Sequence, residues 1–167
     1  LIYKLTGGRS FRTDYSNASR TQLFHLENLC WDEELLKYFR VPADALAEVT
    51  DSDGIFGETD LEGFLEKPIP ICGVLGDSHG ALFGHNCRGE GNIKATYGTG
   101  STVMLNTGGQ QIASRHGLST SLAWKVKGRV SYVLEGNINY TGAVISWLKD
   151  EIGIIASAKE TEALALE

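Results

Sequence analysis

The chain has 167 residues, of which 42% are hydrophobic and 22% are charged, and its formal net charge is −6. This apolar content excludes an intrinsically disordered chain, and an acidic balance without a basic cluster argues against a nucleic-acid partner. No apolar run is long enough to cross a bilayer, so the sequence also argues against a membrane partner.

The cysteines and the two ends of the chain give further expectations. Cys30, Cys72 and Cys87 are odd in number and lack the spacing of metal ligands, so we expect reduced packing residues of a cytoplasmic protein. The chain starts without Met inside an apolar stretch and stops inside a helix-forming one. Such ends are typical of a segment of a longer protein.

The first fifty residues favour helices. Residues 14–29 place Ser16 as an N-cap ahead of leucines on one helical face, which predicts a helix. Residues 31–39 predict a short helix capped by Asp32, with acids in its first turn. Pro42 follows at a favoured first helical position.

The middle of the chain changes in character. Residues 51–68 combine glycines with acidic residues, which is typical of a surface loop. Residues 69–77, IPICGVLGD, form an apolar run that predicts a strand buried on both faces. Residues 78–87 are small and apolar enough for a packed helix, and residues 86–91 are the expected domain boundary.

The second half predicts two strand pairs followed by helices. The first pair surrounds a glycine-rich turn, the second surrounds Gly128, and the helices carry apolar residues at helical spacing or favour helix by propensity. The expected strands are residues 92–98, 102–106, 118–127 and 129–136, and the expected helices are residues 137–154 and 157–167.

Asp77 is the first candidate for chemistry. A carboxylate at the end of a buried strand can accept a proton from a substrate hydroxyl, because ligands bind beyond the carboxyl ends of such strands. Asp is also a good N-cap for the helix that follows, and both interpretations remain open. His79 could contact a polar substrate or be a structural histidine, and Asp77, Ser78 and His79 are too close in sequence to form a catalytic triad.

Glycines supply the second group of candidates. The turn Gly98-Thr99-Gly100-Ser101 lacks the Lys of a Walker loop, but consecutive amides at a turn can bind an anion. A plain structural turn is the alternative. Gly142 inside a helical pattern allows close packing or the close approach of a nucleotide, and Glu135 is either a polar site contact or a strand end.

Five blocks of sequence together carry a resemblance to a known family. They are TDYSNASRTQLF, WDEELL, IPICGVLGDSHGALFGHNC, NIKATYGTGSTVMLNTG and YVLEGNINYTGAVISWLKDE. In this order they resemble the FGGY family of carbohydrate kinases, especially its glycerol-kinase-like and xylulokinase-like branches. The resemblance implies an α/β chain with the actin-like ATPase (ribonuclease H-like) fold. Residues 1–88 would end the N-terminal domain, and residues 89–167 would start the C-terminal domain.

The resemblance also implies roles for individual residues. Asp77 matches the family's catalytic base and is a metal-ligand candidate, and Ser78 and His79 beside it match substrate-binding positions. Gly98, Thr99 and Gly100 match the phosphate-binding hairpin. Nucleotide contacts are implied for Gly142 and Ser146, although Ser146 is shorter than the polar residue usual in glycerol kinases.

The implied activity is transfer of the γ-phosphate of ATP, with Mg²⁺, to a hydroxyl of a small sugar. Ser78 and His79 replace two glutamines of glycerol kinases, which favours a ketopentose such as xylulose or ribulose, with glycerol or another polyol as the alternative. A non-catalytic sugar or nucleotide sensor is the alternative of another class. The family's N-terminal phosphate loop and its adenine motif are missing, so the isolated segment is expected to be inactive. The full-length protein would be a homodimer or homotetramer.

Overall fold

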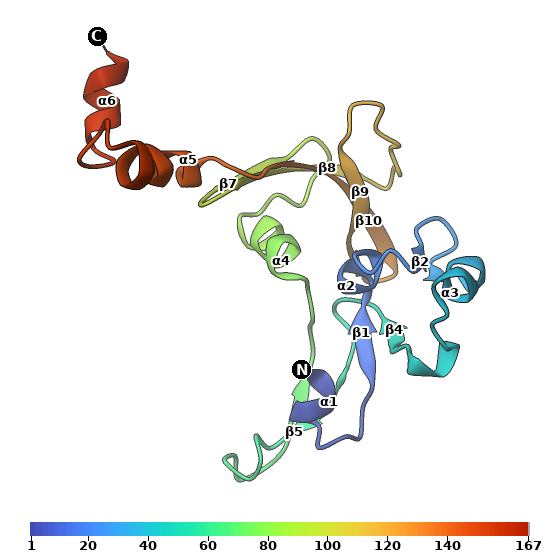
Figure 1. Ribbon diagram of the computed structural model, residues 1–167. Helices are drawn as coiled ribbons and strands as arrows, with labels where there is room; N and C mark the ends of the chain where they lie inside the picture. Colours follow the sequence, from blue (N-terminus) through green and yellow to red (C-terminus); the bar gives the residue numbers. More distant parts are fainter. Residues whose placement is uncertain (167) are drawn as a thin grey trace.

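The computed structural model describes residues 1–166, and Figure 1 shows their helices and strands. The N-terminal part is made of short elements. They are α1 (Ile2–Leu5), β1 (Arg12–Asp14), α2 (Tyr15–Ser19), β2 (Phe24–His25), β3 (Cys30–Trp31), α3 (Glu33–Phe39), the 3₁₀ helix η1 (Ala43–Ala45), β4 (Glu48–Thr50), β5 (Gly57–Thr59), β6 (Ile69–Ile71) and α4 (Asp77–Gly84). Their strands form two-stranded sheets, with β1 parallel to β4 and with β2–β3 and β5–β6 antiparallel.

The C-terminal part is built on one larger antiparallel sheet. Its elements are β7 (Ile93–Tyr97), β8 (Ser101–Gly108), β9 (Ser119–Val126), β10 (Arg129–Ile138), α5 (Gly142–Trp147), the π-helix η2 (Leu148–Ile152) and α6 (Glu160–Ala165). The strand order is β7-β8-β10-β9. In Figure 1, α5 and α6 extend beyond the end of this sheet. No helix within residues 1–166 has the length and apolar character needed to span a bilayer.

The predicted helix over residues 14–29 is wrong beyond its first turns. Helix α2 ends at Ser19, and its N-cap is Asp14 instead of Ser16, since the Asp14 side chain accepts hydrogen bonds from the amides of Ser16 and Asn17. The residues that follow form the β2–β3 hairpin. Phe24 is buried and packs edge-on against Trp31, with ring centroids 5.3 Å apart, so tertiary packing prevails over helical periodicity.

The next predictions have mixed outcomes. Asp32 caps α3 as expected, accepting hydrogen bonds from the amides of Glu34 and Leu35. Pro42 precedes the short η1 helix as its N-cap instead of being its first residue. The expected loop over residues 51–68 contains strand β5, which pairs with β6.

The expected buried strand over residues 69–77 is also wrong. Strand β6 covers only Ile69–Ile71, pairs with β5 alone and leaves Ile69 51% exposed. Residues 72–76 continue to α4 without strand pairing. An apolar run records hydrophobicity but not the number of neighbouring strands, and among residues 1–166 this run has one neighbour.

Both predicted strand pairs are confirmed. The β9–β10 turn is formed by Lys127 and Gly128, and both have positive φ, as a tight hairpin turn requires. The helix expected from residue 137 begins at Gly142, because Ile138 still belongs to β10 and pairs with Ser101.

The hydrophobic cores join the two parts of the chain. One cluster combines Tyr15, Ala18 and Phe24 with Leu122 and Tyr132, so α2 packs against strands of the large sheet. A second cluster combines Leu82 of α4 with Met104, Ala123, Trp124 and Val133. Helices α2 and α4 are therefore fixed to the sheet, and the end of α2 and the start of α4 share one pocket.

Candidate functional site

Asp77 is the first residue of α4, and Gly76 before it is the N-cap. The Asp77 side chain makes no cap bond to the helix; its Oδ1 accepts a hydrogen bond from the adjacent amide of Ser78 at 2.6 Å. The interpretation of Asp77 as an N-cap is therefore wrong. The residue is exposed, so its other carboxylate oxygen is available to a ligand.

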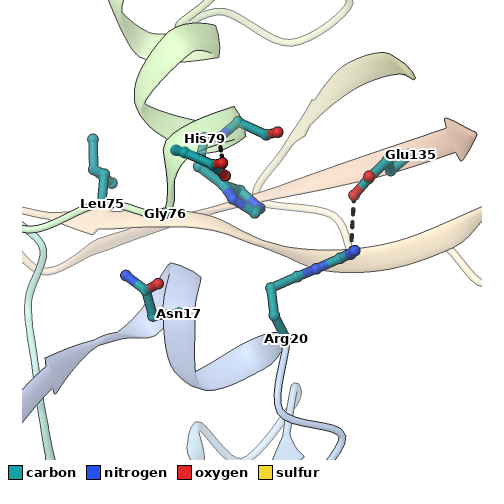
Figure 2. A pocket seen from close by; sticks show the side chains of 8 residues that line it. Asn17, Arg20, Leu75, Gly76, His79 and Glu135 are labelled. Carbon is teal, nitrogen blue, oxygen red and sulfur yellow. Dashed lines mark hydrogen bonds and ion pairs between the residues drawn. The ribbon is translucent and has the colours of Figure 1, made fainter. Parts of the chain in front are cut away.

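Asp77 lines a pocket of about 490 Å³. The lining residues labelled in Figure 2 come from α2 and its C-cap, from the start of α4 and the two residues before it, and from strand β10. Six of the pocket's eight lining residues have polar side chains, and they include Asp77, Ser78 and His79, the predicted base and its two neighbours. The lining residues are Asn17, Arg20, Leu75, Gly76, Asp77, Ser78, His79 and Glu135. Such a set of donors and acceptors suits a ligand with several hydroxyl groups.

The backbone next to Asp77 is fixed by α2. The amide of Gly76 donates to Ser16 Oγ at 2.8 Å, and Ser16 Oγ donates to the Asp14 carboxylate at 2.7 Å. Asp14 is fully buried, and it also accepts hydrogen bonds from Asn17 Nδ2 and Ser52 Oγ. A buried carboxylate that is fully hydrogen-bonded makes a rigid support, because breaking any of these bonds leaves a buried polar group without a partner.

His79 forms the buried wall of the pocket. Its side chain is 3% exposed, and its Nε2 lies 3.2 Å from Ser121 Oγ on β9. Burial and the nearby Arg20 charge lower the pKa of His79 below its usual 6.5, so the imidazole is neutral at pH 7. Ser78 is half-buried, and its carbonyl accepts a hydrogen bond from Lys94 Nζ at 3.4 Å. Substrate contacts by Ser78 and His79 remain predictions.

An ion pair closes the other side of the pocket. Arg20 Nη1, at the end of α2, lies 2.9 Å from Glu135 Oε2 on β10, as Figure 2 shows. Glu135 is thus a polar contact of the site and not merely a strand residue. Sequence reasoning missed Arg20, since a polar residue at the end of a helix carries no local signal of a partner far along the chain. It also missed Asn17, whose side chain bonds the nearby Asp14 and whose place in the pocket depends on how α2 packs.

The glycine-rich turn connects β7 to β8 outside this pocket. The amide of Gly98 donates to the carbonyl of Gly100 at 2.9 Å, so it is not available to a ligand. The amides of Thr99 and Gly100 make no hydrogen bond to any residue in 1–166, and Thr99 is exposed. Two of the three predicted phosphate-binding amides therefore remain free.

Gly142 begins α5 directly against this turn. A Cβ atom at Gly142 would lie 2.5 Å from the carbonyl oxygen of Gly98, so this close packing requires glycine. The amides of Gly142 and Ala143 donate to the carbonyls of Gly98 and Thr99, both at 3.0 Å. The first amides of α5 are thereby used, while Ser146 lies exposed further along the helix. Nucleotide contacts by Gly142 and Ser146 remain predictions.

No group of three or more His, Cys, Asp or Glu side chains within residues 1–166 could hold a metal ion. Asp77 offers a single carboxylate, of which one oxygen accepts the hydrogen bond from the Ser78 amide and the other does not. This matches Mg²⁺, which is commonly held by one or two carboxylates together with phosphates and water.

Matches to the sequence models of known protein families show to which family the chain belongs. The N-terminal domain of the FGGY family of carbohydrate kinases matches residues 1–84, and the C-terminal domain of the same family matches residues 93–167. The chain belongs to the FGGY family of carbohydrate kinases. The division into residues 1–88 and 89–167 remains a prediction within this FGGY chain.

Similar FGGY proteins include several glycerol kinases. The glycerol kinase of Rhodospirillum centenum is 50% identical over 165 residues, which are 99% of this chain and 33% of that protein. Glycerol kinase 1 of Thermotoga maritima is 52% identical over 166 residues, which are 99% of this chain and 34% of that protein. The chain thus spans about a third of the length of these relatives.

Solved structures confirm the expected fold. The glycerol kinase of Plasmodium falciparum with ADP matches with a TM-score of 0.86 and 35% identity, over 95% of this chain and 32% of that one. The xylulose kinase of Lactobacillus acidophilus matches with a TM-score of 0.72 and 20% identity, over 90% and 30% of the two chains. The α/β architecture is therefore the actin-like ATPase fold of FGGY kinases.

Proposed function

We propose that this chain forms the central part of an ATP-dependent kinase that phosphorylates glycerol. The observation that carries the proposal is the exposed carboxylate of Asp77 in a polar pocket, on a chain about half identical to glycerol kinases. The expectation of a ketopentose finds less support, because the xylulose kinases are matched at only 20% and 17% identity. Glycerol, the earlier alternative, fits better.

The chemistry assigned to the chain is proton removal and charge stabilisation. Asp77 would accept the proton of the attacking glycerol hydroxyl. The hydroxyl oxygen would form a bond to the γ-phosphorus of ATP as the bond from that phosphorus to ADP breaks. The free amides of Thr99 and Gly100 would donate hydrogen bonds to phosphate oxygens. Backbone amides suit this role because they are fixed before the reaction and need no reorganisation.

Mg²⁺ would neutralise charge on the phosphates when bound. Within this chain, Asp77 is the residue that would contact it, through the carboxylate oxygen that does not bond the Ser78 amide. A cytoplasmic location and assembly as a homodimer or homotetramer are part of the same proposal. Cell fractionation and light scattering on the full-length protein test them.

The testing experiment measures ADP release by the full-length protein that carries this chain. Glycerol, xylulose and ribulose are supplied in turn as acceptors. We expect turnover on glycerol, and we expect Asp77→Asn to lower kcat about 10²- to 10⁴-fold, which is the usual cost of losing a general base.

The matched control is Asp44→Asn, an exposed carboxylate in η1 that does not line the pocket. It should leave kcat unchanged. Full activity of Asp77→Asn would contradict the assigned base, and preference for a ketopentose would contradict the substrate. ATP binding without turnover on any acceptor would favour a non-catalytic sensor.

A further inference from the structure

The Arg20–Glu135 ion pair is unusually protected on its acidic side. The Glu135 side chain is 8% exposed and that of Arg20 is 44% exposed. Removing a carboxylate from water costs several kcal/mol unless a partner compensates, so Glu135 depends on Arg20 for its burial. Among the pocket-lining residues, Arg20 is the only cation at neutral pH, because His79 is neutral there.

On the Arg20 side, the ion pair connects to the proposed catalytic base through α2. Arg20 is the C-cap residue of this helix, and its backbone amide donates to the carbonyl of Asn17 at 3.1 Å. Ser16 in the same helix accepts the hydrogen bond of the Gly76 amide, directly before Asp77. A shift of α2 would therefore also move Gly76, the residue directly before Asp77.

On the Glu135 side, the ion pair connects to the glycine-rich turn through β10. Glu135 pairs with Met104 on β8, and three positions further Ile138 pairs with Ser101, which follows Gly100. A Cβ atom at Gly100 would lie 2.9 Å from the Ile138 carbonyl oxygen, so β10 and the turn are in close backbone contact. Strand β10, which carries Glu135, thus supports the turn that contains the free amides of Thr99 and Gly100.

We propose that the Arg20–Glu135 ion pair is a positioning element, which fixes Asp77 relative to the phosphate-binding turn at Gly98–Gly100. The inference rests on the proposed function and adds two residues that lie far apart in sequence and pair with each other at the edge of the Asp77 pocket. Their contribution is alignment, and misplacing reacting groups by about 1 Å can cost about 10² in rate.

The test compares Arg20→Gln, Arg20→Lys and Glu135→Gln in the full-length kinase. We expect Arg20→Gln and Glu135→Gln to lower kcat about 10- to 100-fold, with the KM values for ATP and glycerol changed less than about threefold. Arg20→Lys keeps the charge and should retain more activity than Arg20→Gln. Unchanged kcat in Arg20→Gln and Glu135→Gln, or a rise in KM alone, would overturn the proposal.

A double variant separates positioning from general stability. If Arg20 acts through Asp77, adding Arg20→Gln to Asp77→Asn should lower the residual activity less than about twofold, because groups that act as a unit are not additive. If Arg20→Gln lowered kcat by the same factor in the wild type and in Asp77→Asn, the role of Arg20 would be merely structural. Absence of turnover in the wild type would instead overturn the proposed function, and the positioning role with it.

A second ion pair provides the matched control. Lys125 on β9 lies 3.0 Å from Asp51, so this pair also joins the two parts of the chain, and neither residue lines the Asp77 pocket. Lys125→Gln should lower the melting temperature but leave kcat within about twofold of wild type. A loss of kcat as large as that of Arg20→Gln would show that any bond between the two parts has the same effect.

Discussion

At the scale of single residues, His79 shows how burial sets a protonation state. Its pKa lies below the usual 6.5 because its imidazole is desolvated and faces Arg20, although the carboxylates of Glu135, Asp14 and Asp77 act in the opposite direction. As the pH falls below about 6.5, His79 therefore binds a proton in the unfolded chain before it does so in the native protein. Stability contributed in this way is present above about pH 6.5 and is lost as the pH falls further.

His79→Gln should therefore reduce the pH dependence of stability. Between about pH 7 and pH 5, the free energy of unfolding of the wild type should fall more than that of the variant, because only the wild type has this histidine to protonate on unfolding. Urea unfolding at several pH values measures the difference. Parallel pH curves for the two proteins would contradict the assignment.

Gly142 gives a second prediction at this scale. In Gly142→Ala, the added methyl group would meet the Gly98 carbonyl oxygen at 2.5 Å, so the turn or α5 must shift. We expect a loss of about 1–3 kcal/mol in the free energy of unfolding, as for other overpacked sites, and weaker ATP binding by the full-length protein. Gly84→Ala is the control, because a Cβ atom there meets nothing within 4 Å. Equal stability of the two variants would argue against a tight contact.

At the scale of elements, two helices begin with the same cap in different surroundings. Asp14 caps α2 while fully buried and also binds Ser52 Oγ, whereas Asp32 caps α3 nearer the surface with two backbone amides. A cap of the second kind contributes about 1 kcal/mol. The first kind contributes more, because its removal leaves buried donors without partners.

We therefore expect Asp14→Ala to destabilise the chain by about 3 kcal/mol or more, against about 1 kcal/mol for Asp32→Ala. Chemical denaturation of both variants under the same conditions provides the comparison. Similar losses for the two would mean that the buried hydrogen bonds around Asp14 add nothing to its role as a cap.

The same elements show what the sequence could predict. The two hairpins of the large sheet, the cap at Asp32 and the turn at Gly98–Gly100 depend on neighbours in sequence, and the structure confirms them. The helix over residues 14–29 and the buried strand over residues 69–77 were wrong, because their outcome depended on Phe24 packing and on strand number. The Arg20–Glu135 pair could not be predicted, since it forms only when α2 packs on the sheet.

At the scale of the whole molecule, the two hydrophobic clusters do not divide at the expected domain boundary. Each contains residues from both sides of residues 86–91, and Trp124 belongs to one cluster while Trp31 packs against the other. Proteins whose parts share cores usually unfold in one cooperative step. We therefore expect the two clusters to be lost together.

Variants that keep only Trp31 or only Trp124 test this expectation. The remaining tryptophans would be changed to Phe, and fluorescence would follow unfolding in urea. We expect coincident midpoints for the two reporters. Midpoints separated by more than the fitting error would show that the parts on either side of residues 86–91 unfold independently.

The close backbone contacts around the glycine-rich turn also constrain how this protein can diverge. Gly142 meets the carbonyl of Gly98, and Gly100 meets the carbonyl of Ile138, so no side chain on either partner can move aside to admit a new Cβ atom. Neutral drift at positions 100 and 142 is therefore blocked unless the backbone changes in the same step. In deep mutational scanning, these two positions should tolerate almost no substitution, whereas the exposed Ser146 one helical turn away should accept many.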